Sequence, residues 1–140
     1  MLPRAYPLAN AVGRYTEDSV STASPVRLLV MLYDRLTLDL ARGEQALREG
    51  QLDLANAAIG HAQDIIAELL SSLDQDVWDG AAALASIYTW LLTELSTAVL
   101  RADPARVLAC RELVDPLRQA WSEAAASGNL GAPQLAGAVG

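Results

Sequence analysis

Four segments of this chain repeat apolar residues at alternating steps of three and four, and this spacing constrains the fold more than any other feature. It keeps apolar side chains on one side of an α-helix, because the helix has about 3.6 residues per turn. No segment alternates apolar and polar residues cleanly, as a half-buried strand would. The sequence therefore predicts an all-α fold.

The first helix is expected over residues 24–48. Ser24 is a favourable N-cap, and Pro25 fits the first helical position because its missing N–H has no partner there. Gly50 follows the expected end of the helix. The predicted core stripe is Leu29, Leu32, Leu36, Leu40 and Leu47.

The second helix is expected over residues 52–73, and the third from near Asp76 to near Arg101. In the third, Asp76 and Asp79 would complement the positive end of the helix dipole. The second stripe is Leu52, Ala55, Ile59, Ala62, Ile66, Leu69 and Leu73, with Ile65 and Leu54 widening the face. The third stripe is Val77, Ala81, Leu84, Tyr88, Leu91, Leu95 and Ala98.

The fourth helix begins with the same signal, a capping residue followed by proline, at Asp103 and Pro104. Pro116 lies inside this helix, where it removes a hydrogen bond and clashes with the carbonyl of Glu112, so we expect a kink. The predicted core stripe is Val107, Cys110, Val114, Leu117, Trp121 and Ala124.

The links between these helices are short, and short links make consecutive helices antiparallel neighbours. We therefore expect an up-down-up-down four-helix bundle over residues 24–126. Residues 1–23 form a separate N-terminal segment. The glycine-rich residues 127–140 are expected to be a flexible tail.

Composition excludes several classes of function. A net charge of −7 disfavours binding to the phosphate backbone of nucleic acids. Prolines near the N-terminus argue against a signal peptide. Residues 80–100 carry one charge, Glu94, and are long enough to span a bilayer. They are rich in Ala, Ser and Thr and lack basic flanks, so we expect no membrane insertion; solubility without detergent would exclude that rival.

No catalytic or cofactor-binding pattern is evident. The single histidine, His61, shares one side of its helix with Asp64 and Glu68. A zinc site needs three or four ligands, so we expect a polar helix face and no metal, although a bundle enzyme or metalloprotein using His61 stays as a rival. Cys110 lies on the core stripe and should pack as a small apolar residue. The chain is predicted to be a non-enzyme without a cofactor.

The outer faces of two helices carry fewer charges than a solvent-exposed face should. Together they would form a shallow groove for an amphipathic helix of a partner. The alternative is that such alanine-rich faces are simply good helix formers. The candidate contacts on the third helix are Ala82, Ala85, Thr89, Leu92 and Ser96. Those on the second helix are Ala57, Gly60, Asp64 and Ala67.

The first helix contains six consecutive apolar residues, from Leu28 to Tyr33. This run is wider than one helix face, so something must cover the surplus side. The candidates are the N-terminal segment, which carries Tyr15 and Val20, or a partner protein.

The run from Val20 to Pro25, followed by Leu28 and by Met31 to Asp34, resembles the opening signature of the FliS family of flagellin export chaperones. Tyr15 matches a tyrosine upstream of that signature. The likeness covers about residues 15–123. Later matching residues are Ala62-Gln63, Ile65-Ile66, Glu68-Leu69, Ser72 to Asp74, Leu84, Tyr88, Trp90, Leu95, Ala98, Leu117-Arg118 and Trp121.

The resemblance implies a cytoplasmic chaperone that binds the C-terminal segment of flagellin, prevents its premature polymerisation and delivers it to the flagellar type III export gate. Export gate components and other flagellar regulators are implied as further partners. Tyr15 and Val20 would cover the groove until flagellin displaces them. Tyr33 is a further candidate contact, with core packing as the alternative. The rival binding function is an adaptor or anti-regulator that holds another protein's amphipathic helix.

Overall fold

The computed structural model describes residues 24–74 and 79–128. Tyr15, Val20, Asp76 and Val77 lie outside these residues, as does the tail from residue 129. The described part consists of four helices: α2 (Pro25–Arg48), α3 (Leu52–Ser72), α4 (Ala81–Arg101) and α5 (Pro104–Ala126). The predicted all-α four-helix fold is confirmed.

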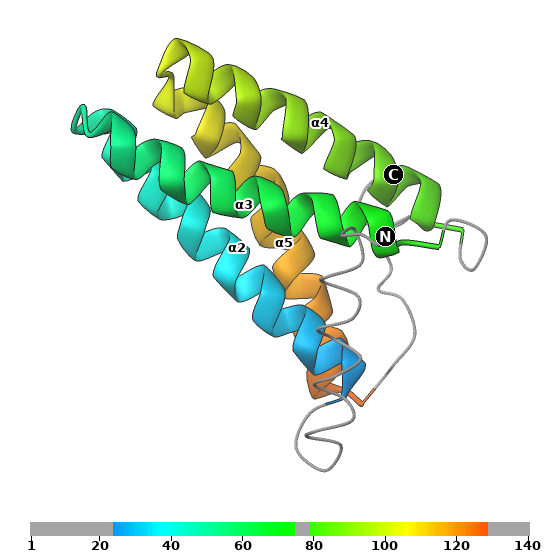
Figure 1. The fold of residues 1–140 in the computed structure, drawn as a ribbon. Helices are drawn as coiled ribbons and strands as arrows, with labels where there is room; N and C mark the ends of the chain where they lie inside the picture. The colour runs from blue at the N-terminus through cyan, green and yellow to red at the C-terminus, as the bar shows by residue number, and fades with distance from the viewer. Residues whose placement is uncertain (1–23, 75–78, 129–140) are drawn as a thin grey trace, which may run out of the picture.

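The four helices pack as a ring. Each helix contacts the next one in sequence, and α5 contacts α2. Consecutive helices run in opposite directions along the bundle (Figure 1). This arrangement is consistent with the expected up-down-up-down topology. Packing is most extensive around α2, which lies against both α3 and α5, and less extensive around α4.

The two cap-then-proline signals start helices where the sequence predicts. The Ser24 hydroxyl accepts a hydrogen bond from the Arg27 amide at 3.3 Å. The Asp103 carboxylate accepts one from the Ala105 amide at 3.1 Å. α4 differs: it begins at Ala81, later than expected, because Asp79 and Gly80 form a turn.

The core contains most of the predicted stripes. Leu36, Leu40, Ile59, Leu91 and Leu95 are fully buried. The other buried stripe residues are Leu47, Ala55, Ala62, Ile65, Ile66, Leu69, Ala81, Leu84, Tyr88, Ala98, Val107, Cys110, Val114, Leu117 and Ala124.

Some predicted core positions are not buried. Leu29 and Leu32 are half-buried. Leu52 and Leu54 are 50 % and 60 % exposed. These two leucines lie in the first turn of α3, at the end of the bundle, where few neighbouring side chains are available to cover them.

A close approach between α2 and α3 explains a glycine that the sequence analysis did not single out. Gly43 is buried, and a Cβ atom placed there would lie 2.6 Å from Cγ1 of Ile59. That separation is shorter than a van der Waals contact. The α2–α3 packing therefore requires the absence of a side chain at position 43.

α4 and α5 each carry a feature that the sequence marked as unusual. Among the described residues, α4 is the one helix long and apolar enough to cross a membrane. Its leucines 84, 91 and 95 are buried within the bundle, as in a core helix. α5 continues through Pro116, which is exposed, so the proline does not end the helix.

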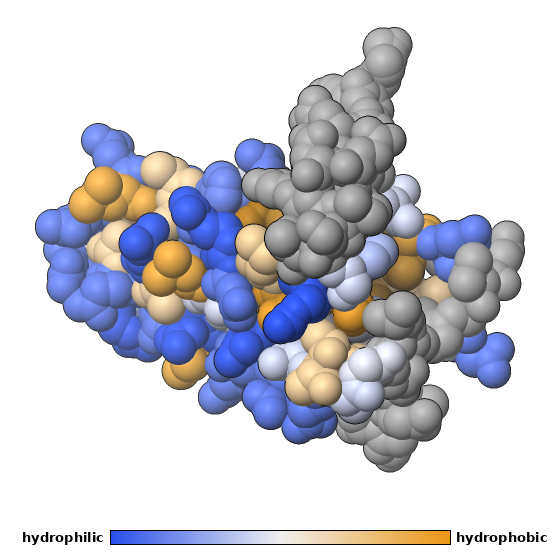
Figure 2. All heavy atoms as spheres, turned by 90° about the horizontal axis from the view of Figure 1, so that it is seen from below, coloured by the Kyte–Doolittle hydropathy of each residue, from blue (hydrophilic) through white to orange (hydrophobic). Residues whose placement is uncertain are grey.

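Seen from below the view of Figure 1, the surface is predominantly polar, with apolar residues in separate groups (Figure 2). A soluble helical bundle has such a surface, since apolar atoms always contribute part of the accessible area. Which groups act as binding sites must therefore be decided from their chemistry.

Candidate functional site

The outer side of α4 forms the main candidate surface. Ala82, Thr89 and Ser96 are exposed there, and Leu92 is half-buried. A shallow, open depression runs along this side beside the end of α3. It is lined by Leu70, Ala82, Ala85, Ser86, Thr89, Trp90 and Thr93, which we call the α4 depression.

Two predicted contacts differ from expectation. Ala85 is only 8 % exposed, so it forms the floor of the α4 depression and not an open outer face. Tyr33 is fully buried, and its hydroxyl shares a 2.5 Å hydrogen bond with that of Tyr88. In this conformation Tyr33 offers no surface to a partner. Tyr33 packs in the core because the buried face of α2 is wider than a single row of leucines.

Four hydroxyl groups of α4, three of them in the α4 depression, are already hydrogen-bonded within their own helix. Thr89 donates to the Ala85 carbonyl at 2.9 Å, and Thr93 donates to the Thr89 carbonyl at 3.2 Å. Ser86 and Thr97 donate in the same way, at 3.2 and 3.1 Å. A partner can cover these donors without leaving them unpaired, which removes the usual penalty for burying a hydroxyl.

None of the described residues that line the α4 depression is charged. Glu94, the acidic residue of α4, forms a 3.1 Å ion pair with the guanidinium of Arg106 in α5. Arg101 lies in the last turn, away from the depression. A partner therefore meets a neutral surface that costs little to desolvate.

α3 contributes to this surface through the side that faces α4. Gln63 Nε2 donates to Ser96 Oγ at 2.9 Å and marks the seam between the two helices. Gly60 and Ala67 are three and four positions from Gln63 and so lie on the same side. At Gly60 an added Cβ would meet nothing within 4 Å, so no neighbour in the described bundle requires a glycine there.

Of the remaining α3 candidates, Asp64 is three positions from Ala67 and so lies on the same side, whereas Ala57 lies elsewhere. Ala57 and Asp64 are exposed. Ala57 lines a separate groove between α2 and α3, on the far side of α3 from the α4 depression. The structure thus brings the α4 candidates together with Gly60 and Ala67 and leaves Ala57 apart. Tyr15 and Val20 lie outside the described residues.

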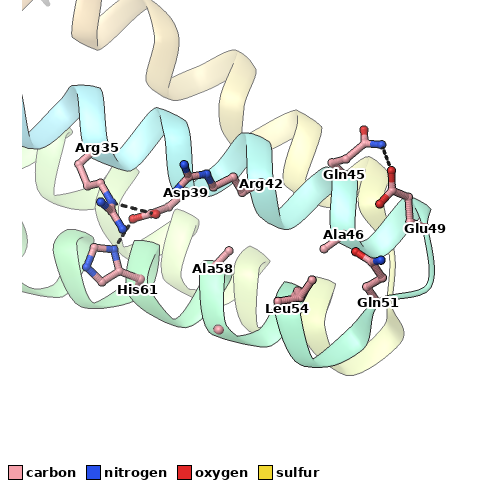
Figure 3. Close-up of a pocket in the computed structure, with 11 residues that line it drawn as sticks. Arg35, Asp39, Arg42, Gln45, Ala46, Glu49, Gln51, Leu54, Ala58 and His61 are labelled. Atoms are coloured by element: carbon pink, nitrogen blue, oxygen red, sulfur yellow. Dashed lines mark hydrogen bonds and ion pairs between the residues drawn. The ribbon is translucent and has the colours of Figure 1, made fainter.

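The groove between α2 and α3 contains the one histidine (Figure 3). His61 of α3 and Arg35 of α2 both point at Asp39, which is only 2 % exposed. Arg35 Nε lies 3.1 Å from Asp39 Oδ1, and His61 Nδ1 bonds to the other carboxylate oxygen. His61 is therefore a partner of a buried carboxylate. Among residues 24–74 and 79–128, no three His, Cys, Asp or Glu side chains are grouped to hold a metal.

A second buried carboxylate joins α2 to α5. Glu44 is 8 % exposed and accepts hydrogen bonds from Arg111 at 2.7 Å and Arg48 at 2.8 Å. Burial by itself raises the pKa of Glu44, but the hydrogen bonds from Arg111 and Arg48 outweigh it, and the pKa is lowered. Glu44 stays ionised and ties the two helices together.

Comparison with known proteins agrees with this architecture. The family model for the flagellar protein FliS matches residues 8–128. The chain belongs to the FliS family.

Relatives and a solved structure agree with this assignment. The FliS flagellar secretion chaperone of Bacillus subtilis is 27 % identical over 117 residues, covering 84 % of this chain and 87 % of that protein. That of Salmonella typhimurium is 29 % identical over 109 residues, covering 76 % and 81 %. A crystal structure of a bacterial flagellar chaperone superposes with a TM-score of 0.69 at 20 % identity, over 86 % of this chain and 99 % of that one, which supports the fold.

FliS proteins are chaperones, so the prediction of a non-enzyme is confirmed. The environment of the Cys110 thiol agrees with a protein that is not an enzyme. Cys110 is fully buried, and burial, together with nearby Glu94, raises the pKa of its thiol to about 12. A thiol that stays protonated is a poor nucleophile.

One residue of the candidate surface was not predicted from the sequence. Trp90 is 43 % exposed and borders the α4 depression. On its other side it borders a second depression, lined by Ser86, Ile87, Trp90, Ala109, Glu112 and Leu113. Helical periodicity in the sequence could have identified it. Trp90 lies between the core positions Tyr88 and Leu91, so its side chain is directed outward.

Proposed function

We propose that this chain is a flagellin-specific export chaperone that binds the C-terminal helical segment of flagellin along the α4 depression. Binding keeps that segment from polymerising too early and supports delivery of flagellin to the flagellar type III export apparatus. The protein acts in the cytoplasm, with flagellin as its main partner and the export gate and other flagellar regulators as further ones.

The observation that carries this proposal is the chemistry of the outer side of α4. The described residues that line the α4 depression are uncharged, their hydroxyls are hydrogen-bonded within the helix, and Trp90 supplies a large apolar contact. Tryptophan is among the residues that most often dominate binding energy at interfaces. An amphipathic helix without its own apolar neighbours would find them here.

The family assignment supports the class of client. The relatives in Bacillus subtilis, Vibrio cholerae and Salmonella typhimurium are each named flagellar secretion chaperone FliS. Flagellin is the abundant secreted subunit of the flagellum, and its terminal helices associate when the filament forms. A chaperone that covers them by binding alone needs neither nucleotide nor metal.

Calorimetric titration with the C-terminal segment of flagellin from the same organism tests the proposal. We expect a one-to-one complex with a negative heat-capacity change, because apolar surface is buried. Ala82→Arg places bulk and charge at the edge of the α4 depression and should weaken binding tenfold or more, about 1.4 kcal/mol. Ala85 is unsuitable for this test because it is buried.

A matched control is available in α5. Ala82 and Ala105 are both exposed alanines at the second position of their helices, so arginine costs the same at the helix dipole in each. Ala105→Arg should leave binding unchanged. Equal loss in both variants would place the contact elsewhere, and no binding by the unmodified protein would favour an adaptor for another helix.

The N-terminal segment is a separate part of the proposal. We infer that Tyr15 and Val20 cover the flagellin-binding groove until flagellin displaces them. The half-buried side chains Leu29 and Leu32 motivate this inference. Deleting residues 1–18 should tighten binding of the flagellin segment or increase aggregation, and a variant that changes neither would contradict it.

A further inference from the structure

The depression between α4 and α5 leaves apolar side chains in water, and the proposed flagellin site does not include it. Trp90 and Leu113 are 43 % and 36 % exposed there. Contiguous exposed apolar side chains often mark a contact site. We call this hollow the α4–α5 depression, and its described lining residues are Ser86, Ile87, Trp90, Ala109, Glu112 and Leu113.

Pro116 adds a backbone acceptor at the same place. In a regular α-helix the amide of residue 116 donates to the carbonyl of residue 112. Proline has no N–H, so the Glu112 carbonyl cannot receive that bond, although α5 continues past Pro116. Because Glu112 lines the α4–α5 depression, an acceptor without its usual helical donor lies beside it. The backbone N–H groups of an extended chain are suitable donors.

An exposed row of side chains leads from this depression to the end of α5. Its members follow one another at steps of three and four, so they lie on one side of the helix. They are Leu113, Pro116, Gln119, Glu123 and Ala126. Gln119 donates a hydrogen bond to Glu123 at 3.1 Å, so this polar pair is satisfied. A segment lying along this row would connect the end of α5 with the α4–α5 depression.

The chain that follows α5 suits an apolar hollow. Gly128 has a φ of 75°, in the left-handed region that ends helices, and residues 129–140 come after it. These residues, which we call the tail, include no charged side chain and carry Leu130, Leu135 and Val139. Pro133 favours an extended backbone at itself and at the residue before it.

Chain length identifies the tail residue that reaches the depression. Leu113 lies 15 residues before Gly128, which is about 22 Å along a helix. Leu135 is the seventh residue after Gly128, and seven extended residues span about 23 Å. Leu130 is only two residues after Gly128 and would reach about 7 Å. Leu135 is therefore the large apolar residue at the matching distance.

We propose that the α4–α5 depression holds the tail of its own chain. The tail turns back at Gly128, runs antiparallel to α5 along the exposed row, and places Leu135 between Trp90 and Leu113. A backbone amide of the extended tail donates to the Glu112 carbonyl, which Pro116 leaves without its helical donor.

Attachment to the same chain favours this occupant. A segment tethered close to its site acts at an effective concentration in the millimolar range, so even a weak contact is populated. Ordering a glycine-rich segment costs conformational entropy, so the contact should be easily released. Trp90 borders both depressions, and a docked tail covers its α5 side and leaves the α4 depression open. The inference therefore does not depend on the proposed client.

Nuclear magnetic resonance of the full chain, without flagellin, tests the inference. The indole N–H resonance of Trp90 is assigned by its loss in Trp90→Phe. Leu135→Asp puts a charge where the apolar contact is proposed, so it should release the tail and shift the Trp90 resonance. The indole resonance of Trp121, whose Nε1 is buried, should stay in place. Circular dichroism should show unchanged helix content.

A matched control lies in the same tail. Leu130→Asp makes the same substitution at a leucine too close to Gly128 to reach the depression, so it should leave the Trp90 resonance unchanged. In the reciprocal test, Leu113→Asp should lower the heteronuclear NOE of the Leu135 amide, because a released segment moves more freely on the nanosecond timescale. Both effects should be independent of protein concentration, as an intramolecular contact requires.

Three results would overturn the proposal. The first is a Trp90 resonance that Leu135→Asp does not shift, or that Leu130→Asp shifts equally. The second is an effect that grows with protein concentration, since the tail would then dock on another copy. The third is a Trp90 resonance that shifts only when residues 1–23 are deleted or the C-terminal segment of flagellin is added, which would assign the depression to that segment.

Discussion

α2 and α4 are helices of similar length in one bundle, and they contact their neighbours in different ways. α2 is joined to α3 through Asp39 and His61, and to α5 through Glu44 and Arg111. α4 is joined to α3 mainly through apolar packing and the neutral pair Gln63–Ser96. It makes one ion pair with α5, between Glu94 and Arg106.

The difference shows how one fold can provide both rigidity and a binding surface. Buried charged pairs are costly to break, because removing one partner leaves an uncompensated charge. They suit the α2 side, which must hold the bundle together. Neutral, internally satisfied groups are easily desolvated, which suits the outer side of α4, where we propose that flagellin binds.

The largest loss of stability is expected from a substitution on the buried side of α4. Leu91 is fully buried, and Leu91→Ala should reduce the free energy of unfolding by about 2–5 kcal/mol through lost burial and a residual cavity. Urea denaturation followed by circular dichroism measures the change. A loss below 1 kcal/mol, as at an exposed site, would mean that the inner and outer sides of α4 are misassigned.

The next largest loss of stability is expected from a substitution that removes a partner of the buried Glu44 in α2. Arg111→Ala removes a hydrogen bond to the ionised Glu44 and should cost about 1.5–3 kcal/mol at neutral pH. Because folding lowers the pKa of Glu44, its ionised form stabilises the protein above the unfolded pKa, and this stabilisation is lost as pH falls through the folded pKa.

The difference in stability between the Arg111→Ala variant and the unmodified protein should therefore shrink as pH falls below the ordinary value of 4.5. Denaturation curves at a series of pH values provide the measurement. A difference that is independent of pH would show that Arg111 acts through packing and not through charge.

Two glycines give opposite predictions. Gly43→Ala should destabilise by about 1–2 kcal/mol, since the new Cβ would meet Ile59 and the clash outweighs the better helix propensity of alanine. Gly60→Ala should instead stabilise by about 0.5–1 kcal/mol, because its Cβ meets nothing. Paired thermal melts compare them, and the same sign in both would contradict the packing described between α2 and α3.

The smallest effect on folding is expected on the outer side of α4. Thr93 is exposed and its hydroxyl bonds only to its own helix, so Thr93→Val should change stability by less than about 0.5 kcal/mol. Calorimetry with the flagellin segment should show unchanged or slightly tighter binding. A large loss of stability would mean that this hydroxyl supports packing between helices.

Local signals in the sequence were sufficient for the fold and for part of the candidate site. The caps at Ser24 and Asp103 act within a few residues, so they could be predicted without knowing any neighbour. The outward direction of Ala82 and Thr89 followed from helical periodicity in the same way. The burial of Ala85 did not, because the apolar arc of α4 is wider than one stripe and its edge depends on where α3 lies.

The sequence by itself determined the number of helices, the start of two of them and most of the core, because periodicity and capping are properties of neighbouring residues. Only the tertiary structure decided that Asp39 and Glu44 are buried and paired. It also decided that Ile59 packs against the backbone at Gly43, and that Leu54 and Trp90 are exposed. These outcomes depend on which helix packs against which and at what distance. The partners on the neighbouring helix are far away in the chain, 16 residues from Gly43 to Ile59, 22 from Asp39 to His61 and 67 from Glu44 to Arg111.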